Sequence, residues 1–158
     1  MGESDMKLYT SYFYQIRFFP PNLVPLSTAP YDPAWYHRNK GKNHVYLDKR
    51  GVINGLRVET LHPDESCEDL CSGKPCDYTS DQCKFLKKYR KQLEKIDFDK
   101  FIEWCHWFAK TYKEAQHIKG EVSLAFIFHE TPDNPCSERV AFQQWFRDHN
   151  MVIDEFKH

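Results

Sequence analysis

Apolar and polar residues follow one another in two patterns that predict different secondary structures. Short apolar runs predict four β-strands, at residues 7–10, 23–27, 122–128 and 151–156. Apolar residues at helical spacing predict three α-helices, at residues 83–95, 98–116 and 137–149. Asp97 stands directly before the second helix and is expected to cap its first turn. Because parallel strands separated by helices need crossover connections, the pattern predicts an α/β sheet in a small three-layer domain.

The segment from residue 29 to residue 66 is rich in proline, glycine and aromatic residues, which predicts mainly loops. Within it, residues 44–47 and 56–60 are candidates for short strands. Residues 11–14 either continue the first strand or form an aromatic loop. A loop-rich stretch of this length is uncommon in a compact domain and is often functional.

The composition is that of one globular domain, expected over residues 6–158, with residues 1–5 set aside as a short tail or cloning remnant. The 158 residues include 22 basic and 23 acidic side chains, so the formal charge is −1. This balance gives no overall attraction to a nucleic-acid backbone, although a local basic patch remains possible. No apolar run reaches the roughly 20 residues that cross a membrane. With no signal peptide before the first predicted strand, we expect a cytoplasmic protein without a membrane partner.

Four of the six cysteines cluster in a predicted cysteine-rich insertion over residues 62–83, at Cys67, Cys71, Cys76 and Cys83. Zinc takes four thiolate or imidazole ligands tetrahedrally, so these cysteines are candidate ligands of a structural zinc ion. Disulfides or reduced thiols explain the cluster equally well, and the spacing does not match the usual iron–sulfur patterns. If all four thiolates bound one ion, no coordination position would stay open for catalysis.

The start of the last predicted helix is a candidate anion site. The first turn of a helix has free backbone amides and the positive end of the helix dipole. Ser137 adds a hydroxyl there, and Arg139 adds a guanidinium suited to phosphate or carboxylate. Cys136 at the same end is expected to have a lowered pKa. Helix capping and packing are the alternative role of these residues.

Two pieces of the chain resemble the DUF488 family of small uncharacterised α/β proteins. The first is the opening Leu8-Tyr9-Thr10-Ser11 with a second strand ending near Ser27. The second is a late apolar strand that leads through an acidic turn to Cys136-Ser137-Glu138-Arg139. The family motif is Cys-His-Arg at the helix start, so this chain lacks the histidine and has its arginine one residue later. The resemblance implies a Rossmann-like fold, with a site where the N-terminal strands meet this helix. Compact chains of this type also occur in phage genomes, so the resemblance is compatible with a phage origin.

If the fold follows this resemblance, hydroxyls, arginines and aromatic rings gather at one edge of the sheet. Tyr14 and Tyr31 are further candidates to stack a base, and Arg38 is a further candidate for an anion, although core packing is the commoner role of a single aromatic residue. We therefore expect a small phosphorylated nucleotide or nucleotide-derived ligand to bind at the strand ends and the start of the helix at 136–139, in a protein that sequesters it. The predicted ligand-binding residues are Thr10, Ser11, Tyr12, Arg17, Ser27, Trp35, Cys136, Ser137 and Arg139.

His129 and Glu130 follow the central predicted strand, where α/β enzymes often hold a general acid or base. A carboxylate facing a ribose could stabilise an oxocarbenium-like centre. Hydrolysis of an N-glycosidic bond in a nucleotide or nucleoside is therefore an alternative function, with Glu130 and His129 as catalytic candidates.

The helix predicted at residues 83–95 carries five lysines and an arginine, which makes a nucleic-acid-binding module a further alternative. Acidic residues just before it, including Asp64 and Asp81, offset this charge. A solvated lysine face is the more usual role of such a helix, so nucleic acid is not the favoured partner.

Overall fold

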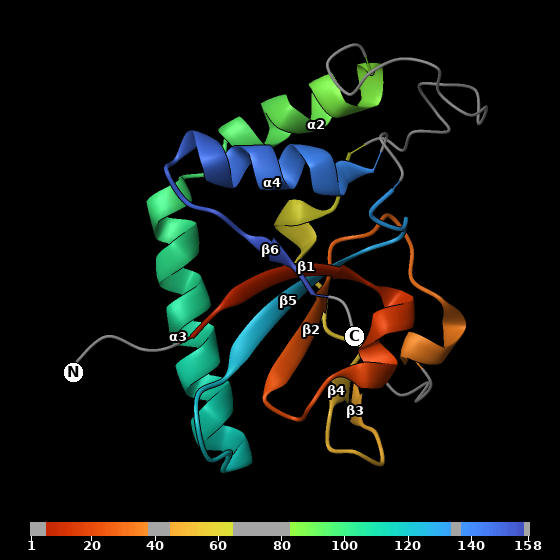
Figure 1. Ribbon diagram of the computed structural model, residues 1–158, viewed down its shortest axis with the longest axis vertical. Coiled ribbons are helices and arrows are strands. Elements are labelled where there is room, and N and C mark those ends of the chain that lie inside the picture. The colour runs from red at the N-terminus through yellow and green to blue at the C-terminus, as the bar shows by residue number, and fades with distance from the viewer. Residues whose placement is uncertain (1–5, 38–44, 65–82, 134–136, 157–158) are drawn as a thin grey trace.

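The computed structural model describes residues 6–37, 45–64, 83–133 and 137–156 (Figure 1). Its centre is a four-stranded parallel sheet in the order β2-β5-β1-β6. The strands are β1 (Leu8–Tyr12), β2 (Leu23–Ser27), β5 (Ser123–Phe128) and β6 (Asp154–Glu155). The expected α/β class is confirmed, and residues 11–12 continue the first strand as one of the two alternatives allowed.

Strand β5 is central because its neighbours on both sides pair with it over their full length. Leu8 to Tyr12 pair with Leu124 to Phe128, and Leu23 to Ser27 pair with residues 123–127. Leu124, Phe126 and Phe128 belong to the larger apolar core, whereas Ala125 and Ile127 belong to the smaller one. The nearly unbroken apolar run thus reflects burial on both faces of the sheet.

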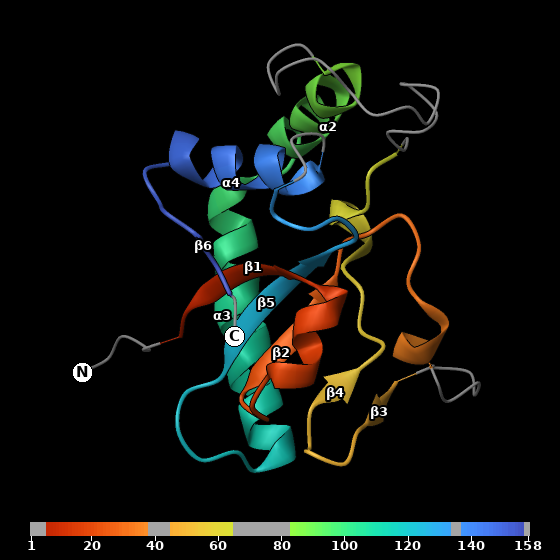
Figure 2. The same ribbon diagram turned by 45° about the vertical axis from the view of Figure 1, so that its right-hand side comes forward.

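Three α-helices contribute to the larger core: α2 (Lys84–Glu94), α3 (Phe98–Gln116) and α4 (Glu138–Asp148). Figure 2 shows α4 above the sheet, with α2 beyond it as the outermost of these elements. Asp97 caps α3 as expected, since its carboxylate accepts a hydrogen bond from the Lys100 amide at 3.1 Å. Ser137 caps α4 by accepting from the Arg139 amide at 3.2 Å.

The loop-rich segments form the layer on the opposite face, where they enclose the smaller core. This layer contains two 3₁₀ helices and one antiparallel hairpin: η1 (Phe13–Phe18), η2 (Ala34–His37), β3 (Tyr46–Leu47) and β4 (Ile53–Asn54). A further 3₁₀ helix, η3 (Glu59–Leu61), lies on the larger-core side, where Leu61 is buried and its carbonyl accepts from the Tyr89 hydroxyl of α2. The strand candidate at 44–47 overlaps β3. The candidate at 56–60 is wrong, because only Arg57 forms a β-bridge there, with Ser27, and a 3₁₀ turn follows.

The connections leave the neighbouring strands β1 and β5 in opposite directions. From β1 the chain crosses to β2 through η1 on the smaller-core face, and from β5 it crosses to β6 through α4 on the larger-core face. The carboxyl ends of β1 and β5 are therefore a topological switch point of the sheet, the place where open α/β sheets bind ligands. In the described part of the chain, no helix combines the length and apolar character needed to cross a membrane.

Candidate functional site

Arg139, in the first turn of α4, lies at the switch point between the two strands. Its guanidinium carbon is 5.8 Å from the ring centre of Tyr12, which ends β1, and 5.4 Å from that of Phe128, which ends β5. Gln15 donates to the Tyr12 hydroxyl at 3.1 Å. The two ends of the chain therefore meet here, as the sequence predicted.

The donors of Arg139 are nevertheless engaged within the protein. Its Nε donates to Glu155 Oε1 at 2.7 Å, and an Nη atom donates to the Ser11 carbonyl at 3.0 Å. Thr10 donates to the same Glu155 oxygen at 2.8 Å and accepts from Gln143 at 2.9 Å. With Arg139 only 3% exposed, this ion pair joins α4 to β1 and β6 rather than offering a free cation to a ligand.

A second acid, Glu138, is buried beside Arg139. Glu138 is 1% exposed, and its carboxyl group interacts with that of Glu130, just beyond β5. Burial and the neighbouring Glu130 raise the pKa of Glu138 to about 8, although Arg139 acts in the opposite direction. Burial, with a smaller contribution from Glu138, also raises the pKa of Tyr89 on α2. Glu138 thus carries a proton at neutral pH next to a second carboxyl group.

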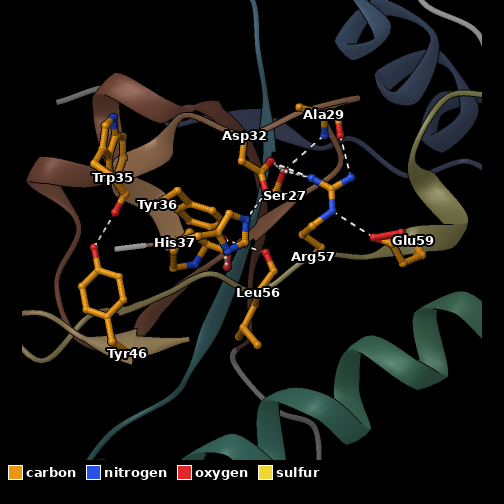
Figure 3. A network of polar contacts seen from close by, with 11 residues as sticks. Ser27, Ala29, Asp32, Trp35, Tyr36, His37, Tyr46, Leu56, Arg57 and Glu59 are labelled. Atoms are coloured by element: carbon orange, nitrogen blue, oxygen red, sulfur yellow. Dashed lines mark hydrogen bonds and ion pairs between the residues drawn. The ribbon is translucent and has the colours of Figure 1, made fainter. Parts of the chain in front are cut away.

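Asp32 is the centre of a separate polar network at the carboxyl end of β2 (Figure 3). Its side chain is 3% exposed, and its two oxygens contact three partners. Oδ1 accepts from Ser27 Oγ at 2.5 Å and from Arg57 at 2.6 Å, while Oδ2 lies 2.5 Å from His37 Nε2. Arg57 also donates to the Ala29 carbonyl at 2.7 Å. The carboxylate therefore holds together the turn after β2, the end of η2 and the segment after β4.

The same residue types occur in nucleophilic triads, but their connections here differ. Ser27 donates to Asp32 and not to His37, so the histidine is not placed to take the serine proton as it does in a triad. Although burial lowers the pKa of Arg57, its bonds to Glu59 and Asp32 raise it overall, which keeps the guanidinium charged. The network fixes the shape of the turn and is not arranged for attack by Ser27.

A cavity of about 720 Å³ lies between η1, η2 and the β3–β4 hairpin. Aromatic and cationic side chains line it, including Phe13, Arg17, Trp35, Tyr46, Lys49 and Arg50. The Trp35 ring meets Phe13 edge-on at 6.2 Å, and its backbone carbonyl accepts from the Tyr46 hydroxyl at 2.8 Å. The cavity thus combines a partly exposed indole ring with exposed positively charged side chains.

The structure distributes the predicted ligand-binding residues over three places. Thr10, Ser11, Tyr12, Ser137 and Arg139 meet at the switch point, Ser27 belongs to the Asp32 network, and Arg17 and Trp35 line the cavity. Thr10, Ser11, Ser27 and Ser137 are fully buried, so their hydroxyls bind protein groups. Cys136 and Arg38 lie outside the described residues.

The catalytic candidates also separate. His129 is exposed and lies against Tyr31, with 5.0 Å between ring centres, whereas Glu130 pairs with Glu138. Of the zinc candidates, Cys67, Cys71 and Cys76 lie outside the described residues, and Cys83 is a buried free thiol directly before α2. Within the described residues, no group of three or more histidine, cysteine, aspartate or glutamate side chains is placed to hold a metal ion.

Several residues of these networks carried no sequence-based expectation: Asp32, His37, Arg57, Glu138 and Glu155. Asp32 did have a usable signal, because it follows the carboxyl end of a strand in a turn bounded by Pro30 and Pro33. Arg57 and Glu155 had none, because their partners are distant in sequence. When the chain is compared with protein-family models, curated proteins and solved structures, none of them matches it.

Proposed function

We propose that the protein binds and sequesters a small phosphorylated nucleotide or nucleotide-derived ligand. The observation that carries this proposal is the cavity of about 720 Å³, in which an indole ring, a phenol and exposed cations face the same space. Small-molecule sites usually have volumes of about 300–1,000 Å³ and combine aromatic walls with a few polar groups. A nucleotide needs both kinds of contact, a flat ring for its base and positive charge for its phosphate.

Trp35 is the residue we assign to the base. Trp35 is 39% exposed, and its backbone is held by the hydrogen bond that the Tyr46 hydroxyl donates to its carbonyl. The Asp32 network adds to this by anchoring the end of η2 at His37, two residues further on. Stacking of a base on such a ring is worth about 1–3 kcal/mol.

Arg17 and Lys49 are the residues we assign to the phosphate. Both are exposed at the cavity, and Arg17 is held by its contact with the Tyr14 ring, 3.9 Å from the guanidinium carbon. Asp48 also lines the cavity, but Arg50 pairs with it at 2.7 Å and reduces its repulsion of an anion. This assignment replaces Arg139, whose donors are engaged by Glu155 and Ser11.

We also propose that the sheet is Rossmann-like. This is supported by the connections from β1 and β5, which leave these neighbouring strands in opposite directions, and by the elements that cover both faces of the sheet. The structural zinc site is a further proposal, which a measurement of bound metal tests. Most of the cysteine-rich insertion, residues 65–82, lies outside the described residues.

Hydrolysis of an N-glycosidic bond is the second candidate, and the Glu130–Glu138 pair favours it. A carboxyl that keeps its proton at neutral pH beside a second carboxyl is suited to general acid catalysis. In this alternative water attacks the sugar carbon as the bond to the base breaks, and the proton retained by Glu138 passes through the neighbouring Glu130, the more exposed of the two, to the departing base. Incubation with nucleosides and nucleotides, followed by chromatography for the free base, tests it, and Glu130→Gln should abolish release.

Isothermal titration calorimetry with nucleosides and their mono-, di- and triphosphates tests the binding proposal. We expect a phosphorylated member to bind, Trp35→Ala to weaken its binding about tenfold or more, and Arg17→Ala to weaken it only for phosphorylated ligands. Trp107→Ala and Arg147→Ala are matched controls, since both residues are exposed and lie on α3 and α4. If no member of the panel binds, or if the control variants lose as much affinity, the proposal fails.

A further inference from the structure

Helix α2 presents a continuous row of lysines to the solvent. At 100° per residue, five exposed side chains fall within an arc of about 100°: Lys84, Lys87, Lys88, Lys91 and Lys95. The row extends along about 16 Å of the helix axis, because each residue advances it by 1.5 Å. Glu94 is the one exposed acid within the helix.

The position of α2 leaves this row accessible among the described elements. The opposite face of the helix is buried in the larger core through Phe85, Leu86, Tyr89 and Leu93. Both views show α2 on the outside of α4, at one end of the molecule (Figures 1 and 2). Within the described residues, no carboxylate lies at ion-pair distance from Lys84, Lys87, Lys91 or Lys95.

A shallow groove of about 220 Å³ runs beside the row, lined by Lys88, Lys91 and Lys95 together with Asp64 and Gln92. Gln92 fixes one wall of this groove to the segment before α2, because it donates to the His62 carbonyl at 2.7 Å and accepts from the Asp64 amide at 2.9 Å. The groove is smaller than a nucleotide site and suits a single phosphate group. Asp64 opposes an anion there, but three lysines face it.

We propose that this lysine face of α2 binds the phosphate backbone of a nucleic acid. A row of lysines reads no bases, so the expected binding is electrostatic, independent of sequence and strongly dependent on salt. The chain has a net charge of −1, so attraction to a phosphate backbone depends on this local row of lysines and not on the charge of the whole molecule.

A membrane surface fits the same face less well. A helix that lies on a membrane places large apolar residues beside its cations. The exposed large apolar residues of the described chain lie on other elements, at Tyr14, Tyr31, Trp35, Leu47, Trp107 and Val152. The apolar residues of α2 are instead buried against the rest of the protein.

Fluorescence anisotropy with a labelled 20-nucleotide single strand and the matching duplex tests the proposal on the full chain. We expect binding at 50 mM salt that weakens steeply by 200 mM. The triple variant Lys88→Gln, Lys91→Gln and Lys95→Gln should weaken it at least tenfold and reduce the slope of log K against log salt by about 2 to 3, at roughly 0.7 to 0.9 per lost phosphate contact. The triple variant Lys100→Gln, Lys110→Gln and Lys119→Gln removes the same charge from exposed positions outside α2 and should bind nearly as well as the unchanged protein.

Three results would overturn the proposal: no binding of either probe at 50 mM salt, equal losses in both triple variants, or binding to anionic lipid vesicles with none to nucleic acid. Circular dichroism first establishes that the variants are folded, and the single variant Lys91→Glu replaces the triple variant if that one is not. The outcome is separate from the cavity proposal, because substitutions on α2 leave Arg17 and Trp35 in place.

Discussion

Glu138 is an acid whose burial makes the stability of the fold depend on pH. Glu130, Tyr89 and Arg139 are the titratable or charged groups that interact with it, and only Arg139 favours its charged form. The pKa of Glu138 is about 8 in the folded protein, against a usual value of 4.5. Between these two values the folded chain holds a proton that the unfolded chain has released. Stability must therefore fall as the pH rises through this window.

We predict that Glu138→Gln removes most of this pH dependence. At pH 5 the variant and the unchanged protein should have similar melting temperatures, because Glu138 is protonated in the folded state. At pH 8.5 the variant should be more stable, by on the order of 2–3 kcal/mol, which corresponds to roughly 5–10 °C. Differential scanning calorimetry over this pH range measures the effect.

The matched control is Glu103→Gln, which changes an exposed acid on α3. Its melting temperature should follow that of the unchanged protein at every pH, since surface substitutions usually alter stability by less than about 0.5 kcal/mol. A Glu138→Gln variant that loses stability equally at both pH values would show that Glu138 contributes through hydrogen bonds and not through its charge.

Among the elements, η1 and the β3–β4 hairpin are held in place by one side chain from the turn between the strands. Arg50 donates to the carbonyls of Ile16, Arg17 and Phe19, at the end of η1, and also to Asp48 at 2.7 Å. Short 3₁₀ helices have poor internal hydrogen-bond geometry, so partners for their last carbonyls matter. Arg50 thus fixes two walls of the cavity relative to each other.

We predict that Arg50→Ala weakens ligand binding in the cavity about tenfold while the rest of the fold persists. The loss should appear in calorimetry as a weaker affinity, and η1 amides should exchange faster with deuterium, which a direct ligand contact alone would not cause. Arg90→Ala on α2 is the control. If the η1 amides keep their protection, Arg50 does not position η1.

The three α-helices could be predicted closely because each one buries a single apolar stripe in the larger core. The predicted helix at 98–116 coincides with α3, and the other two differ from α2 and α4 by only one residue at each end. The short elements could not be predicted in this way. The hairpin and η1 depend on Arg50, and the segment at 56–60 is fixed by the bonds of Arg57 to Ser27 and Asp32. These are tertiary contacts without a local pattern.

The meeting of the two ends of the chain at the switch point was predictable, whereas its chemistry and the position of the cavity were not. Thr10 and Arg139 meet because the carboxyl ends of parallel strands share one edge of a sheet, which the order of elements implies. The engagement of Arg139 by Glu155 could not be foreseen, since Glu155 lies in a strand of only two residues, whose position depends on pairing with the distant strand β1. The cavity depends on how η2 and the hairpin pack, which the sequence pattern left open.

At the scale of the whole molecule, the sheet joins segments from opposite ends of the chain. Leu8 pairs with Leu124 and Tyr9 pairs with Asp154, so no strand of the sheet finds its partner locally. Such long-range pairing forms late and cooperatively, because the entropy of closing large loops must be overcome first. The contact of β6 with β1 and α4 is therefore expected to affect the stability of the entire fold.

We predict that removal of residues 153–158 lowers the melting temperature by 10 °C or more. The truncation deletes β6 and leaves Arg139 buried without Glu155, and an uncompensated buried charge costs about 3–5 kcal/mol. This is a large part of the 5–15 kcal/mol that stabilises a typical domain. Thermal unfolding followed by circular dichroism measures the loss.

The effect of Arg139→Met should then reverse its sign between the two chains. In the truncated chain it removes an unpaired buried charge while keeping contact with Tyr12 and Phe128, so it should restore part of the lost stability. In the full chain the same substitution leaves Glu155 without its cation and should be destabilising. A loss of stability in both chains would mean that Arg139 stabilises the fold mainly through its bond to the Ser11 carbonyl and its packing, and that the ion pair between the two ends of the chain contributes little.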